Sequence, residues 1–157
     1  MRVRDAMTHG IIGVRDTASL AEAVETMLRA GISALCVFDE RKALVGILSE
    51  GDLMRPFGQA NAMRRAWWLE LLAEGTQLAP AFLDYIKLDR RRAQDLMVAP
   101  VVTVPETATL PEIADLLAQR HIKRVPVLRG DRLVGIVSRA DVVGALARMP
   151  VPTLADL

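Results

Sequence analysis

The stretches VGILSEGD (residues 45–52) and VGIVSRAD (residues 134–141) decide how this chain folds, because they are two versions of one sequence. Each starts with an apolar run typical of a β-strand. It then passes through a serine to an aspartate three residues later, a pattern typical of a helix start. Upstream, DAM at residues 5–7 reappears as DLM at residues 95–97, in the same order. We therefore interpret the 157-residue chain as a tandem duplication.

Both copies predict the same order of secondary structure. Ser19 and Thr109 are helix-capping residue types, and a glutamate follows each of them three residues later, at Glu22 and Glu112. This spacing is the capping-box signature of a helix start. The β-type runs after these helices occupy residues 35–38, 44–48, 125–128 and 133–137. With a second helix after each pair of runs, each copy predicts strand, helix, strand, strand, helix, so the expected fold class is α+β.

The duplication predicts how the chain is divided. We expect a first repeat at 1–57, a helical hairpin insertion and linker at 58–92, a second repeat at 93–148 and a tail at 149–157. One repeat of roughly 55 residues cannot readily bury its apolar face alone. We therefore expect the two repeats to pack as a pseudo-twofold disc with a cleft on its axis, a common place for a ligand.

The composition excludes several classes of protein. An apolar fraction of 52% argues against disorder, and a net charge of +1 indicates no bulk attraction to nucleic acid or an anionic membrane. The longest apolar run, near residues 43–48, is far too short to span a membrane, and no signal peptide is expected. Cys36 is the only cysteine, so no internal disulfide forms and a reduced, cytoplasmic location fits.

Catalytic and metal-binding motifs are not visible in the sequence. His9 and His121 are the only histidines, and neither has a cysteine or carboxylate at metal-ligand spacing. Neither a nucleophile motif nor a glycine-rich phosphate loop is present. We therefore expect a non-enzymatic binding module with no metal and no cofactor.

The two closing stretches resemble a known signature. GILSEGD (46–52) and GIVSRAD (135–141) look like the Gly-x-x-Ser/Thr-x-x-Asp motif that ends a CBS domain. IKRVPV (122–127) resembles that family's Arg-x-Pro-Val strand, and its counterpart ISALCV (32–37) has Cys36 where the family has proline. The resemblance covers residues 1–57 and 93–148 and implies a tandem pair of CBS domains.

The resemblance implies a regulatory module that binds an adenosine-type ligand such as AMP, ADP, ATP or S-adenosylmethionine. A carboxylate such as that of Asp52 or Asp141 can accept hydrogen bonds from two adjacent ribose hydroxyls. Ser49 and Ser138, near helix starts, suit a phosphate group. The same residues also have plain alternatives as helix-start acids and helix caps. Binding would shift the geometry of a homodimer and so signal to an unknown target protein.

By resemblance, each ligand site draws on both repeats. The first site is expected to use Thr17, Ser33, Ala34, Lys123, Arg124, Ser138, Arg139 and Asp141. The second is expected to use Ser49, Asp52, Thr107 and Ile122. Arg139 has a planar fork that matches phosphate oxygens, whereas Glu50 at the equivalent position would repel phosphate. We expect the first site to accept phosphate, and the second to be empty, weak or suited to an uncharged adenosyl group. Solvated surface charge is the alternative role for Arg124 and Arg139.

The insertion carries two predicted helices, at residues 62–73 and 78–88. Its Trp67 and Trp68 either pack on the flank of the module or contact a second copy or a partner protein. The Trp-Trp insert resembles that of bacterial CBS pairs which sometimes continue into a BON domain, although nothing after Met149 supports such a domain.

Two other functions therefore stay open. One is a ligand-free CBS scaffold that assembles proteins through the helical insertion. The other is an adaptor for nucleic acid or a membrane surface that uses the basic residues 90–92, for which strong salt dependence would be expected.

Overall fold

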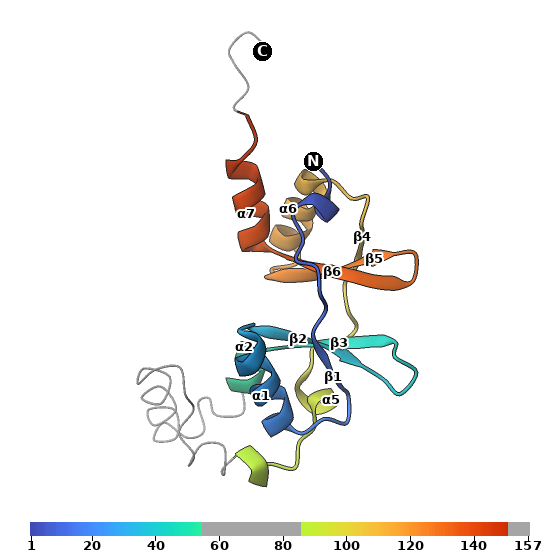
Figure 1. The fold of residues 1–157 in the computed structure, drawn as a ribbon, viewed down its shortest axis with the longest axis vertical. Coiled ribbons are helices and arrows are strands. Elements are labelled where there is room, and N and C mark those ends of the chain that lie inside the picture. Colours follow the sequence, from blue (N-terminus) through green and yellow to red (C-terminus); the bar gives the residue numbers. More distant parts are fainter. Residues whose placement is uncertain (55–85, 151–157) are drawn as a thin grey trace, which may run out of the picture. The chain divides into compact units, whose positions relative to one another are not determined.

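The computed structural model describes residues 1–54 and 86–150, which fall into two compact units (Figure 1). Unit 1 combines Met1–Ile11 with Val102–Leu157, and unit 2 is the continuous stretch Ile12–Val101. Each unit has one three-stranded sheet with helices against one of its faces.

The elements follow the predicted order in both repeats. Unit 2 contains β1 (Gly13–Arg15), α1 (Leu20–Ala30), β2 (Ala34–Phe38), β3 (Leu44–Ser49), α2 (Glu50–Met54) and α5 (Ala93–Leu96). Unit 1 contains the 3-10 helix η1 (Val3–Asp5), β4 (Val104–Pro105), α6 (Leu110–Gln119), β5 (Arg124–Arg129), β6 (Arg132–Ser138) and α7 (Arg139–Ala147). The α+β fold with two repeats of strand, helix, strand, strand, helix is confirmed.

The two sheets have the same topology. In unit 2 the central strand β2 is parallel to β1 and antiparallel to β3, and in unit 1 β5 has the same relation to β4 and β6. The register pairs Leu35 with Leu48, and Val125 with Val137. Opposite residues of an antiparallel pair point to the same face. These four fully buried residues therefore form the centre of each unit's core, against the helices.

The first helix of each repeat begins at the predicted capping residue. The Ser19 hydroxyl accepts a hydrogen bond from the Glu22 N–H at 3.1 Å. Thr109 makes the full reciprocal box, since its own N–H donates to the Glu112 carboxylate at 2.7 Å. Gly31, with φ of 64°, follows the end of α1, where only a residue tolerant of the left-handed conformation fits without strain. The predicted helix starts are confirmed at both residues, and the full capping box is found at Thr109.

Each compact unit contains the opening segment of the other repeat. The Val3 N–H donates to the Ala108 carbonyl at 2.8 Å, and Thr8 exchanges two backbone hydrogen bonds with Ile136, which holds residues 1–8 in unit 1. The matching segment of the second repeat lies in unit 2. There the Ala93 N–H donates to Ala18 at 2.9 Å, and Val98 exchanges two backbone hydrogen bonds with Ile47. The compact units and the sequence repeats therefore have different boundaries.

A methionine from each exchanged segment lies against a glycine of the third strand. A Cβ added at Gly46 would collide with Met97, and one added at Gly135 would lie 2.7 Å from the Met7 sulfur and 2.8 Å from the Thr8 carbonyl oxygen. The Thr8 oxygen belongs to the backbone and cannot move aside without breaking the bond to β6. Glycine at 135 is therefore required by close approach of the opening segment.

The Gly135→Ala substitution should lower the free energy of unfolding by about 1–3 kcal/mol, because it overpacks this contact. Gly144→Ala, within α7, is the matched control, since its Cβ would meet nothing nearer than the Arg148 side chain at 3.7 Å. It should raise stability by about 0.5–1 kcal/mol, because alanine favours a helix over glycine. Urea unfolding followed by circular dichroism measures both. Equal stability of Gly135→Ala and wild type would contradict the close approach.

The predicted insertion falls almost wholly outside the described residues. This applies to the helix expected at 62–73, to Trp67 and Trp68, and to most of the helix expected at 78–88. Residues 86–88 are helical, and Ile86 is buried in the core of unit 2. Within residues 1–54 and 86–150, no helix combines the length and apolarity that crossing a membrane requires.

Candidate functional site

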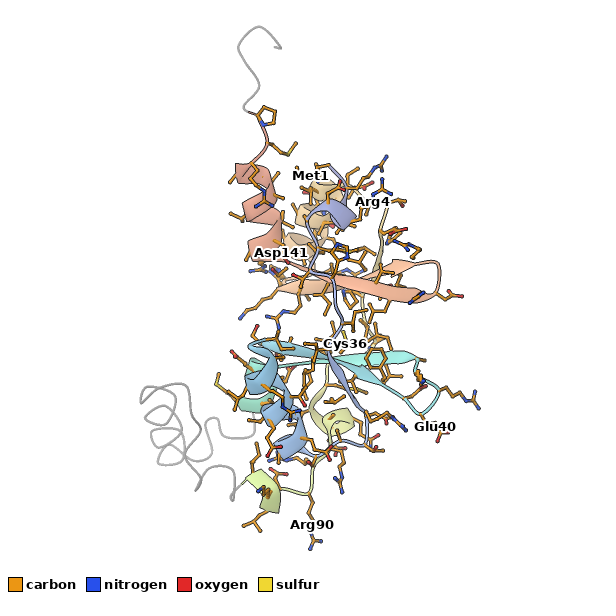
Figure 2. The ribbon with its side chains drawn as sticks, viewed as in Figure 1. Met1, Arg4, Cys36, Glu40, Arg90 and Asp141 are labelled. Carbon is orange, nitrogen blue, oxygen red and sulfur yellow. The ribbon has the colours of Figure 1, made fainter. Side chains whose placement is uncertain are left out.

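The start of α7 is built by a reciprocal pair of residues, Ser138 and Asp141. The Ser138 N–H and hydroxyl both donate to Oδ2 of Asp141, at 2.8 and 2.9 Å. In return the Asp141 N–H donates to the Ser138 hydroxyl at 3.2 Å. The other carboxylate oxygen, Oδ1, accepts no hydrogen bond from any described residue. Asp141 is half-buried, so this oxygen is held in a fixed place by a carboxylate whose partner oxygen serves the helix cap (Figure 2).

The start of α2 repeats this arrangement. The Ser49 N–H and hydroxyl donate to Oδ2 of Asp52 at 2.8 and 2.9 Å, and the Asp52 N–H donates back at 3.3 Å. Asp52 is 6% exposed and is the buried polar residue of the described chain. The two boxes therefore agree to within about 0.1 Å in each hydrogen bond.

Strand pairing brings most of the predicted site residues to these two boxes. In unit 2, Ala34 pairs with Ser49, and the Glu50 N–H donates to the Ser33 carbonyl at 3.0 Å. We call Ser33, Ala34, Ser49, Glu50 and Asp52 the Asp52 cluster.

In unit 1 the same junction carries more positive charge. Arg124 pairs with Ser138, and the Arg139 N–H donates to the Lys123 carbonyl at 2.9 Å. Arg139 also donates from Nε to the Ile122 carbonyl at 3.0 Å. We call Ile122, Lys123, Arg124, Ser138, Arg139 and Asp141 the Asp141 cluster.

Two predicted residues lie at the opposite end of their own sheets. β1 runs parallel to β2 and ends at Arg15, which pairs with Phe38. Thr17 therefore lies beyond the far end of β2, roughly 13 Å along the strand from Ala34. There it lines a hollow with Glu40 and other charged residues. Figure 2 shows Glu40 at the β2–β3 turn. Unit 2 does not bring Thr17 to Ser33 and Ala34.

Thr107 has the equivalent place in unit 1. It follows β4, whose Pro105 pairs with Leu128, and its carbonyl accepts a hydrogen bond from Nη1 of Arg2 at 2.6 Å. Thr107 is therefore at the other end of the sheet from Ile122.

Ile122 was expected in the second site, and the hydrogen bond of its carbonyl group with Arg139 in the Asp141 cluster was not expected. By accepting the Nε–H of Arg139 this carbonyl fixes the direction of the guanidinium group. Every residue has such a carbonyl, so no sequence pattern signals this contact.

Cys36 lies on β2, two residues from Ala34, and is fully buried. Burial away from water raises the pKa of its thiol from 9.0 to about 11. Residues with lowered pKa lie elsewhere: the Arg91 side chain lowers the pKa of Asp89, the Arg129 side chain that of Glu106, and the Thr109 N–H that of Glu112.

The thiol predicts a pH dependence. Above about pH 9 the unfolded thiol ionises while the folded one stays neutral until about pH 11, so stability is present below pH 9 and is lost through this window. Between pH 8 and about 10.5 the wild type should lose about 2 kcal/mol more of its free energy of unfolding than Cys36→Ala does. Urea unfolding at both pH values measures this difference. The two proteins differ only at residue 36. An equal loss of unfolding free energy in both would therefore contradict the raised pKa of Cys36.

Metal ligands do not gather in the part of the chain that the structure describes, where no group of three or more histidine, cysteine or carboxylate side chains is placed to hold an ion.

Comparison with known proteins gives a consistent result. The family model described as CBS domain matches the chain twice, over residues 3–57 and 93–148. The A-adding tRNA nucleotidyltransferase of Geobacter sulfurreducens is 31% identical over 112 residues, which is 67% of this chain. The chain spans only 12% of the length of that relative.

Two solved structures resemble the fold. The structure of CBSX2 in complex with AMP is 26% identical, with a TM-score of 0.65, over 94% of this chain and 96% of that one. CBSX2 is a chloroplastic protein of Arabidopsis thaliana. The CBS domain pair of protein MJ0100, in complex with 5′-methylthioadenosine and S-adenosyl-L-methionine, has a TM-score of 0.70 over 94% of this chain and 96% of that one. The identity with the MJ0100 domain pair is 21%, so this similarity concerns the fold alone.

Proposed function

Because this chain belongs to the CBS domain family and carries two copies of the domain, we propose that it is a regulatory module that binds an adenosine-type nucleotide. CBS domains are generally regulatory and not catalytic. The main support is the carboxylate of Asp141, whose Oδ1 accepts no hydrogen bond from the described residues while its Oδ2 is fixed by the helix cap. AMP, ADP, ATP and S-adenosylmethionine are the proposed ligands, and no catalytic role is proposed.

The chemistry of the Asp141 cluster suits a ribose. Two vicinal ribose hydroxyls can donate to one carboxylate, and hydrogen bonds to an ionised acceptor are stronger than neutral ones. The Ser138–Asp141 box has already fixed the rotamer of the carboxylate, so little side-chain entropy is lost on binding.

The same cluster suits a phosphate. Lys123 and Arg139 are exposed cations, and Arg124 is half-buried opposite Ser138. α7 has nine residues, and the partial positive charge at its start also favours an anion. The AMP held by CBSX2 supports a nucleotide with a phosphate as the ligand.

We further propose a homodimer in the cytoplasm whose geometry changes when the nucleotide binds. Such a change requires that the ligand bind the two dimer geometries with different affinity. The protein that receives the signal would contact one geometry better than the other, by the same linkage.

A thermal-unfolding screen with AMP, ADP, ATP and S-adenosylmethionine should find at least one ligand that stabilises the protein. At a hundred times its dissociation constant, a specific ligand adds about 2.7 kcal/mol to the free energy of unfolding. Asp141→Asn should weaken binding of that ligand about tenfold, because the ribose loses a charged acceptor. Titration calorimetry measures the loss.

Asp5→Asn is the matched control, because Asp5 also caps a helix in unit 1, accepting the Arg2 N–H at 2.9 Å outside the Asp141 cluster. It should bind the ligand as wild type does. The proposal fails if none of the four ligands stabilises the protein, or if Asp141→Asn binds as tightly as Asp5→Asn.

A further inference from the structure

The residue that follows each capping serine occupies the same place in both units. The Glu50 N–H donates to the Ser33 carbonyl at 3.0 Å, and the Arg139 N–H donates to the Lys123 carbonyl at 2.9 Å. These two residues are the first of α2 and α7, and both are exposed. Since the neighbouring boxes also agree, the two side chains leave equivalent points of the backbone, directly before the helix turn that carries the aspartate.

The charge at this place is opposite in the two units. Arg139 is held by its Nε donation to the Ile122 carbonyl, and its two Nη groups donate to no described residue. This hydrogen bond leaves the two Nη groups of the guanidinium for an anion. They can bind it with two parallel hydrogen bonds. Glu50 presents a carboxylate at the equivalent point, two residues before Asp52.

The strand partner of each capping serine differs in the same sense. Arg124 pairs with Ser138, whereas the uncharged Ala34 pairs with Ser49. The charge difference between the two clusters therefore involves the strand partner of the serine as well as the residue that follows the serine.

We infer that this position is a charge selector: Arg139 admits an adenosine compound with a 5′-phosphate to the Asp141 cluster, and Glu50 rejects phosphate from the Asp52 cluster. Any adenosine compound that binds the Asp52 cluster then carries an uncharged or cationic 5′ group. The inference rests on the proposed function, since it assigns ligand charge to sites that the proposal treats as adenosine sites.

The selector is tested by reversing each charge. Glu50→Arg should raise the affinity of the Asp52 cluster for AMP about tenfold, through one new charge-assisted hydrogen bond, and so add a second AMP per chain. Arg139→Glu should weaken AMP binding at the Asp141 cluster by about tenfold or more for the same reason. Adenosine, which lacks the phosphate, should change by less than about threefold in both variants. Titration calorimetry gives both affinity and stoichiometry.

Two matched variants make the same charge reversals at the other end of each sheet. Glu40→Arg lies at the β2–β3 turn of unit 2, and Arg132→Glu begins β6 in unit 1; both residues are exposed. Neither should change the ratio of the dissociation constants of adenosine and AMP. Circular dichroism and a urea unfolding curve for each variant establish that it is folded.

The outcomes distinguish a failure of the charge selector from a failure of the proposed function. If wild type binds AMP or adenosine and neither Glu50→Arg nor Arg139→Glu changes their ratio beyond its control, the selector is wrong and the proposed function stands. A change in adenosine and AMP by the same factor also overturns the selector, since it indicates a general loss of the site. If wild type binds neither compound, the selector fails, and the proposed function fails with it only if ADP, ATP and S-adenosylmethionine also leave the protein unstabilised.

Discussion

Both units depend on the hydrogen bonds between a serine and an aspartate where the third strand turns into a helix. At this junction the strand ends at Ser49 or Ser138, and the next residue is already helical. The first N–H groups of a helix have no partner within it, and the serine N–H donates to the aspartate carboxylate. One carboxylate oxygen and one hydroxyl satisfy these groups. The fold itself therefore fixes the aspartate before any ligand arrives.

In this arrangement, the residues that build the turn are not the residue that sets the charge presented to a ligand. The serine and the aspartate are needed for the turn, so they are the same in both units. The residue that follows the serine donates its backbone N–H to the carbonyl of Ser33 or Lys123 in both units, whatever its side chain. Its side chain is exposed and can change from glutamate to arginine without altering a backbone hydrogen bond. A duplicated domain can thus keep one scaffold and still differ in the charge that it presents.

Local features of the sequence predicted the elements and the serine and aspartate at each closing helix start, because caps, strand pairs and turns depend on residues close together in the chain. Long-range features were not accessible in this way. Thr17 was expected beside Ser33, but β1 runs parallel to β2, and this direction carries Thr17 to the far end of the sheet. The Ile122 carbonyl that orients Arg139 has no side-chain signature. No local sequence pattern predicted the exchange of opening segments between the repeats, because the exchange depends on which sheet a segment joins.

That exchange affects how the protein forms during synthesis. Domains generally fold as units while the ribosome extends the chain from its N-terminus. Unit 2 is continuous, so all of its residues are available once Val101 has emerged. Residues 1–11 are made before unit 2, yet the strand that they join, β6, is made only after more than a hundred further residues. The side chains of Val3 and Met7, which are buried in unit 1, therefore remain without the strand that covers them until β6 has been made.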